Sequence, residues 1–106
     1  MICRMWHGIT PRSRADAYMA FLEQRAVTDY RSVPGNLSVS VLRRDEPEVT
    51  HFMTVTHWES EESIRAFAGE DLLRAKYYPE DQDFLLEFEP AVQHFIVAAF
   101  MDAAQQ

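Results

Sequence analysis

Cysteine, glycine and proline are all scarce in this 106-residue chain, which has one Cys, three Gly and five Pro. A single cysteine, Cys3, cannot form an internal disulfide, and this favours a reducing compartment. So little glycine and proline excludes collagen-like and low-complexity chains. The longest hydrophobic run covers seven residues, 95–101, whereas a membrane-spanning helix needs about 20. The N-terminus also lacks the apolar stretch of a signal peptide, so we expect a cytoplasmic protein.

The chain also has few positively charged residues. It contains 10 Lys and Arg and 17 Asp and Glu, which gives a net charge of −7. Residues 1–53 are nearly balanced at +1, and residues 54–106 carry −8. The one adjacent basic pair, Arg43-Arg44, is followed at once by Asp45-Glu46. Nucleic-acid binders need clustered cations, so we expect neither nucleic acid nor an anionic membrane as a partner.

The length indicates one domain over the whole chain, and its first half reads as a strand, a helix and a hairpin. Residues 2–9 predict the strand. Apolar residues at steps of three and four then predict a helix over 11–31, with Thr10 as its N-cap. Alternation in 37–43 and the Val- and Thr-rich stretch 49–58 predict two strands joined by a short turn.

The second half predicts a return to helix and then to strand. Ser60 is placed to cap a short helix that Gly69 can close. A second helical piece is predicted over 71–78. After an acidic segment that also contains aromatic residues, 91–100 predicts a last, apolar strand.

The resulting order, βαββαβ over residues 1–106, is typical of an α+β fold of the ferredoxin-like type. Such chains form a four-stranded antiparallel sheet with two helices on one face. The predicted last strand is apolar on both of its faces, and two helices cover only one. An exposed apolar sheet face is an association site, so we expect two sheets to pack face to face in a homodimer.

Five segments share a pattern with one family of small α+β proteins. They are the turn 34–35 (PG), 55–60 (VTHWES), 67–71 (FAGED), 75–81 (AKYYPED) and 86–90 (LEFEP). The resemblance that they support extends over nearly the whole chain. The sequence resembles the antibiotic biosynthesis monooxygenase-like proteins of the dimeric α+β barrel superfamily, in a largely uncharacterised subgroup.

The resemblance implies a pocket between the sheet and the helices, one in each subunit. Characterised monooxygenases of the family oxidise electron-rich polycyclic aromatics without metal or flavin, because the deprotonated substrate reacts directly with dioxygen. The protein supplies a base, an apolar cavity and hydrogen bonds to the developing oxyanion. We therefore expect a small aromatic or polyketide-like ligand and no cofactor.

The haem-degrading branch of the family offers a test of the aligned positions. Those relatives carry Asn, Trp and His where this chain has His7, Phe67 and Tyr77. Tyrosine can ligate ferric haem, but all three residues differ. The resemblance therefore ranks haem binding below the other functions.

The resemblance also supplies the candidate site. His7 is the predicted base, because imidazole accepts a proton near neutral pH, and Tyr77 is the predicted hydrogen-bond donor. The position that His7 takes in the resemblance places it on the pocket side, and the opposite parity of Trp6 on the first strand then assigns Trp6 to the dimer side. The predicted substrate-binding residues are Phe67, Met19, Trp58 and Tyr78. Packing roles are the alternative for these residues, and a hydrogen-bonded core position is the alternative for His7.

The other titratable candidates are less specific. His51 and His57 lie six residues apart on one predicted strand, about 20 Å at strand rise, too far to share a metal. A cluster of His7, His51 and His94 is possible, but no carboxylate is clearly placed beside it, so no metal is expected. Cys3 reads as a small buried residue rather than a nucleophile.

Three functions remain open. The first is a cofactor-independent monooxygenase, or a related oxygen-using or isomerising enzyme. The second is a non-catalytic ligand-binding or accessory dimer, and the third is a haem binder. Oxygen uptake separates the first from the second, and haemin titration tests the third.

Overall fold

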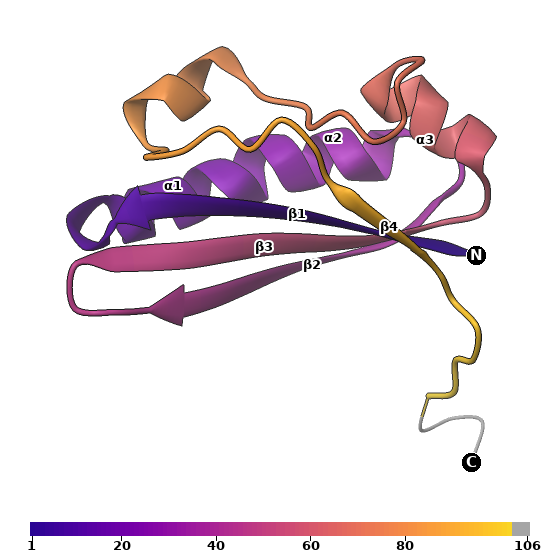
Figure 1. Cartoon of the computed structure of the whole chain (residues 1–106), viewed down its shortest axis with the longest axis horizontal. Helices are drawn as coiled ribbons and strands as arrows, with labels where there is room; N and C mark the ends of the chain where they lie inside the picture. The colour runs from indigo at the N-terminus through magenta and orange to yellow at the C-terminus, as the bar shows by residue number, and fades with distance from the viewer. Residues whose placement is uncertain (103–106) are drawn as a thin grey trace.

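The computed structural model describes residues 1–102, which form an antiparallel sheet with helices on one side (Figure 1). Its four strands lie in the order β2-β3-β1-β4. They are β1 (Ile2–Pro11), β2 (Asn36–Asp45), β3 (Val49–Trp58) and β4 (Gln93–Ile96). Every neighbouring pair is antiparallel. The predicted α+β ferredoxin-like fold is therefore confirmed.

The two central strands divide their residues between a helix-covered face and an open face. In β3, Phe52 and Trp58 are fully buried, as are the threonines between them. The alternate residues His51 and Met53 are only partly buried. Trp6 of β1 lies opposite Thr54 on the helix-covered face, and His7 lies opposite Met53 on the open face.

One long helical segment crosses the sheet in three parts, α1 (Ala15–Phe21), the π-helical turn η2 (Leu22–Ala26) and α2 (Val27–Ser32). A 3-10 turn, Arg12–Arg14, precedes it. The predicted N-cap at Thr10 is wrong, because β1 continues to Pro11 and the Thr10 hydroxyl donates to the Pro11 carbonyl instead.

The short helix α3 (Glu61–Ala68) begins and ends where the sequence predicts. The Ser60 hydroxyl accepts a hydrogen bond from the Ser63 backbone N–H at 3.3 Å. Gly69 ends the helix with a φ of 95°, a conformation that glycine adopts without strain. Ile64 and Phe67 form its buried face.

The predicted helix over 71–78 is wrong. This segment starts with a turn, in which Arg74 N–H donates to the Asp71 carbonyl, and is irregular beyond it. Its backbone pairs with the chain just before β4: Ala75 N–H donates to the Pro90 carbonyl, and Val92 N–H donates to the Leu73 carbonyl. The buried guanidinium of Arg4 donates to the carbonyls of Leu72 and Arg74. A 3-10 turn, η3 (Pro79–Asp83), follows.

The last strand is also shorter than predicted, with four residues in place of ten. Its register places Phe95 opposite Cys3 and Ile96 opposite Ile2. Phe95 is 50% exposed and Ile96 is 76% exposed.

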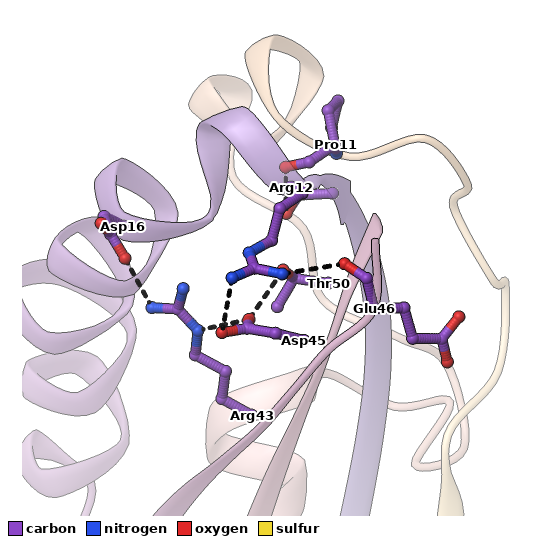
Figure 2. Close-up of polar contacts among 8 residues, drawn as sticks. Pro11, Arg12, Asp16, Arg43, Asp45, Glu46 and Thr50 are labelled. Carbon is purple, nitrogen blue, oxygen red and sulfur yellow. Dashed lines mark hydrogen bonds and ion pairs between the residues drawn. The ribbon is translucent and has the colours of Figure 1, made fainter. Parts of the chain in front are cut away.

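An ion-pair cluster ties the tip of the β2–β3 hairpin to the start of α1 (Figure 2). Arg43 lies 2.8 Å from Asp16 and 2.8 Å from Asp45, and Arg12 donates to the Glu46 carbonyl at 3.0 Å. Figure 2 shows the Glu46 side chain pointing away from this cluster. Each exposed ion pair contributes little by itself, and the contact of the cluster with Glu46 is through the backbone carbonyl of that residue.

Across residues 1–102, no helix has the length and apolar character needed to cross a bilayer.

Candidate functional site

Five of the six predicted site residues lie on the helix-covered side of the sheet. Phe67 and Trp58 belong to the buried core there, and the remaining three pack against it: Met19, Tyr77 and Tyr78. His7 alone lies on the open face. The structure therefore gathers five of the predicted residues on one side of the sheet and places the predicted base on the other.

Phe67 and Trp58 fill the inner end of the space between sheet and helices. Phe67 stacks on Tyr30 with ring centroids 4.5 Å apart and lies 5.7 Å from Trp58. The Trp58 indole N–H donates to the Thr56 hydroxyl at 2.8 Å. In this structure both side chains pack the core.

A small void and a larger hollow on this side share two of their lining residues. The void has a volume of about 20 Å³, and Trp6, Tyr18, Leu22, Ala26, Tyr30, Thr54, Lys76, Tyr78 and Asp81 line it. The hollow measures about 520 Å³ and is lined by Gln24, Arg25, Thr28, Asp29, Ser32, Lys76, Tyr77, Tyr78 and Pro79. Ligand sites usually measure about 300–1,000 Å³, so the hollow has that size and the void does not.

Lys76 and Tyr78 line both spaces, and Asp29 of α2 holds both of them. The Lys76 ammonium lies 2.8 Å from the Asp29 carboxylate, and the Tyr78 hydroxyl donates to the same oxygen at 2.5 Å. Burial of Asp29 would raise its pKa, but the hydrogen bonds from Lys76 and Tyr78 outweigh burial and lower that pKa. Burial raises the pKa of Tyr78. We call these three residues the latch.

Asp81 is a buried carboxyl group at the void. It is 2% exposed, and its oxygens accept the Tyr18 hydroxyl at 2.9 Å and the Tyr78 backbone N–H at 2.6 Å. Burial raises its pKa. A buried carboxyl with a raised pKa in a cleft is a candidate acid–base group.

Trp6 places an indole donor at the same void as this carboxyl group. Its buried indole N–H makes no hydrogen bond of good geometry with the described residues, but it lies close enough to the Tyr77 hydroxyl to oppose the rise in the pKa of Tyr77 that burial causes. Tyr77 meets the indole edge-on at 6.2 Å, but its hydroxyl donates to the Glu89 carbonyl at 2.6 Å. The assignment of Trp6 to the dimer side is therefore wrong, since Trp6 lines the void under the helices.

His7 points to the opposite, open face, so its predicted place in the helix-covered pocket is wrong. Its Nδ1 lies 3.0 Å from the Glu89 carboxylate, and its Nε2 lies 3.0 Å from Nδ1 of His51. His94 is elsewhere, 3.0 Å from the Arg4 guanidinium. Of the possible three-histidine cluster, the structure forms the His7–His51 pair. A catalytic role for His7 stays a prediction.

The sequence reasoning missed most of the polar partners. Asp81 had a local signal, because Tyr78-Pro79-x-Asp81 has the spacing of a helix N-terminus, and the structure forms that cap. No local sequence signal pointed to the latch, since Asp29 lies 47 residues from Lys76. Glu89, likewise, is 82 residues from His7.

Two further expectations concern metals and Cys3. Among residues 1–102, no group of three or more His, Cys, Asp or Glu side chains is arranged to hold a metal ion. Cys3 is buried as expected, and burial raises the pKa of its thiol.

The fold and the cleft together define a small ferredoxin-like protein with an aromatic space between sheet and helices. The family model for antibiotic biosynthesis monooxygenases matches residues 10–76, and the chain belongs to this family. No curated protein matches it.

Solved structures with the same fold include haem-bound proteins. The chain is 20% identical to MhuD of Mycobacterium tuberculosis, a haem degrader with two haems in its active site (TM-score 0.65, 96% of this chain and 100% of the other). It is also 20% identical to a MhuD mutant with two manganese protoporphyrin IX molecules per active site (TM-score 0.62, 97% and 100%). A protein from Bacillus cereus named as an antibiotic biosynthesis monooxygenase is 17% identical (TM-score 0.63, 99% and 98%). At these identities the likeness shows the fold.

Proposed function

We propose that this chain is a monooxygenase-like protein that binds a small aromatic or polyketide-like molecule in the helix-covered cleft. One observation carries the proposal. An indole donor, Trp6, and a buried carboxyl group, Asp81, border the same void, and the adjoining hollow has the volume of a ligand site.

The ligand enters by displacing the latch. Moving Lys76 and Tyr78 away from Asp29 joins the hollow to the void, because these two side chains line both. Both belong to the irregular 71–78 segment. A ring then packs against Tyr77 and Tyr78, and a ring oxygen accepts the Trp6 indole N–H.

Asp81 is the base that we assign to this cleft, in place of His7. As carboxylate it takes a proton from the ligand carbon or hydroxyl, and the Trp6 N–H stabilises the charge left on oxygen. For a methylene between two rings, one oxygen atom of O₂ becomes the ketone and the other leaves as water with the two hydrogens. No metal or flavin is needed in this scheme.

We also propose that two copies pack through the open sheet face. Exposed apolar side chains lie on or beside it, among them Leu42, at 51%, and Phe95, at 50%. The family resemblance implies the same dimer. The single Cys3 fits a reducing cytoplasm.

The test is oxygen uptake with anthrone and hydroquinone substrates. Asp81→Asn should lower turnover about a hundredfold or more, the effect of losing a general base. Asp83→Asn, an exposed change in the same turn, is the matched control and should be neutral. Saturable binding of these substrates without oxygen uptake would support the accessory-dimer alternative.

Haem is the second ligand to test. The residues do not fit it well, because Tyr77 is held by the Glu89 carbonyl and the inner void measures about 20 Å³. Haemin titration should therefore give no saturable Soret band. If the wild-type protein gives a saturable Soret band and Tyr77→Phe does not, the ligand is haem and not the proposed aromatic molecule.

A further inference from the structure

The latch directs two hydrogen-bond donors at one carboxylate oxygen. The Lys76 ammonium and the Tyr78 hydroxyl both meet Oδ2 of Asp29, at 2.8 Å and 2.5 Å. An ammonium group only donates hydrogen bonds. Burial raises the pKa of Tyr78, so its hydroxyl also remains a donor at neutral pH. The latch is therefore a two-donor site for a carboxylate, and in the closed state the Asp29 side chain of the chain itself fills it.

A second cation lies on the inner side of the latch. The Lys76 ammonium lies 4.3 Å from the centre of the Phe67 ring, and the Arg4 guanidinium lies 5.9 Å from the same centre. Arg4 is 2% exposed, and its hydrogen-bond partners among the described residues are two backbone carbonyls and His94, none of which is a carboxylate. A buried cation without an anionic partner is costly, so this end of the cleft favours a negative group.

Arg25 gives Asp29 an alternative partner on the outer side of the latch. It precedes Asp29 by four residues in the same helical segment and borders the same hollow. Its positive charge already contributes to the lowered pKa of Asp29. The ion pair of Arg25 with Glu80 measures 3.5 Å, longer than the 2.8 Å between Lys76 and Asp29. Asp29 can therefore turn from Lys76 to Arg25 and keep a cationic partner.

The charge of the ligand determines what opening the latch costs. A neutral ligand that separates Lys76 from Asp29 leaves the ammonium without an anion, next to the buried charge of Arg4. An anionic ligand returns a carboxylate to Lys76 and Tyr78. The hollow of about 520 Å³ is large enough for a molecule of two or three rings that carries such a group.

We infer that the ligand of the helix-covered cleft is an aromatic carboxylic acid, whose carboxylate replaces Asp29 on Lys76 and Tyr78. The inference rests on the proposed function, since the hydroxylated ring of the same molecule extends into the cleft to Trp6. Asp29 turns to Arg25 when the ligand binds. The carboxylate and the ring hydroxyl lie at opposite ends of the ligand, so the carboxylate stays in the hollow and the hydroxyl faces the void.

The charge requirement is tested with 6-hydroxy-2-naphthoate, which carries its hydroxyl and its carboxylate at opposite ends of two fused rings. Methyl 6-hydroxy-2-naphthoate has the same rings and hydroxyl but no charge. Calorimetric titration of the wild-type protein at pH 7 should give a Kd at least tenfold lower for the acid than for the ester. Equal Kd values, or a lower Kd for the ester, would overturn the inference.

Variants of the latch should change this preference in opposite directions. Lys76→Gln should abolish the tenfold preference for the acid, and Lys76→Arg, which keeps the charge, should retain it. Asp29→Asn should increase the preference, because the ligand carboxylate then no longer displaces a like charge. Comparing two ligands within each variant cancels any general loss of stability.

Two exposed changes of the same charge are the matched controls. Arg74→Gln lies in the same segment as Lys76, and Glu23→Gln lies in the same helical segment as Asp29. Both should keep the wild-type preference. A preference for the acid that survives in Lys76→Gln, or that is lost equally in Arg74→Gln, contradicts the carboxylate site at the latch.

The Trp6 indole signal in ¹H–¹⁵N spectra separates this inference from the proposed function. If acid and ester both move that signal and bind equally, the carboxylate site is wrong and the helix-covered cleft stands. If the acid is preferred through Lys76 and the Trp6 signal stays in place, the carboxylate site stands and the proposed position of the ring is wrong. If neither compound binds and anthrones do not bind, both are wrong.

Discussion

Polar side chains are buried on one face of the sheet and partly exposed on the other. On the helix-covered face, Thr50, Thr54 and Thr56 are at most 2% exposed, and aromatic rings fill the space around them. On the open face, His7 and His51 keep contact with solvent and face each other across the β1–β3 pair. Packing therefore closes the proposed site behind the latch, while the histidines of the open face lie at the surface of the single chain.

The two faces also differ in how a ligand would reach their polar side chains. In the proposed helix-covered site, a ligand must first displace Lys76 and Tyr78 to reach Asp81 and Trp6. On the open face, four side chains meet from β1, β3, the hairpin turn and the segment before β4.

Neighbouring residues of β3 give the largest contrast between the faces. Phe52→Ala should cost about 3–5 kcal/mol of unfolding free energy, because it empties a fully buried site against Tyr18. Met53→Ala, on the half-buried open face, should cost roughly 1 kcal/mol in the monomer. Urea denaturation of both variants measures the difference, and equal losses would contradict the assignment of faces.

The proposed dimer gives the next contrast. Phe95→Asp should yield a monomer of 12.3 kDa with unchanged secondary structure, because a charge at the open face opposes association. Leu73→Asp is the matched control, since Leu73 is also 50% exposed but lies in the 71–78 segment. Light scattering at micromolar concentration measures the mass of each variant in solution. A monomeric wild-type protein would exclude the dimer.

The latch should give a smaller, pH-dependent effect. The folded pKa of Asp29 is lowered, so its ionised form stabilises the fold above the unfolded value of about 3.9, and this contribution is lost as the pH falls through the folded value. Asp29→Asn should cost about 1.5–3 kcal/mol at pH 7, as expected for hydrogen bonds to a charged group, and progressively less towards pH 2. The exposed Glu23→Gln is the control, and a pH-independent loss would argue against an ionised latch.

Local pattern predicted the parts of the fold that depend on neighbours in sequence. The strand 49–58 was predicted residue for residue, and Ser60 and Gly69 bound α3 as expected. The helix predicted over 71–78 failed because its backbone bonds go to residues 90–92, a pairing that no local periodicity reveals.

The candidate site was predicted only in part, for a related reason. Alternation separates His7 from Trp6, but both faces of β1 mix polar and apolar residues. The sequence therefore shows that the two lie on opposite sides without showing which side the helices cover. On β3 the helices cover mainly threonines, so polarity does not identify the open face. Distant partners such as Glu89 and Asp29 follow only from the folded chain.

The central claim, that ligand binds under the helices beside Trp6, has one direct test. The chain has two tryptophans. The Trp58 indole N–H donates to Thr56 at 2.8 Å, whereas the Trp6 indole N–H makes no hydrogen bond of good geometry with the described residues. Titration with a hydroxylated polycyclic aromatic, followed by ¹H–¹⁵N spectra, should shift the Trp6 indole signal and leave that of Trp58 in place. Saturable binding that leaves the Trp6 signal unmoved would contradict the account.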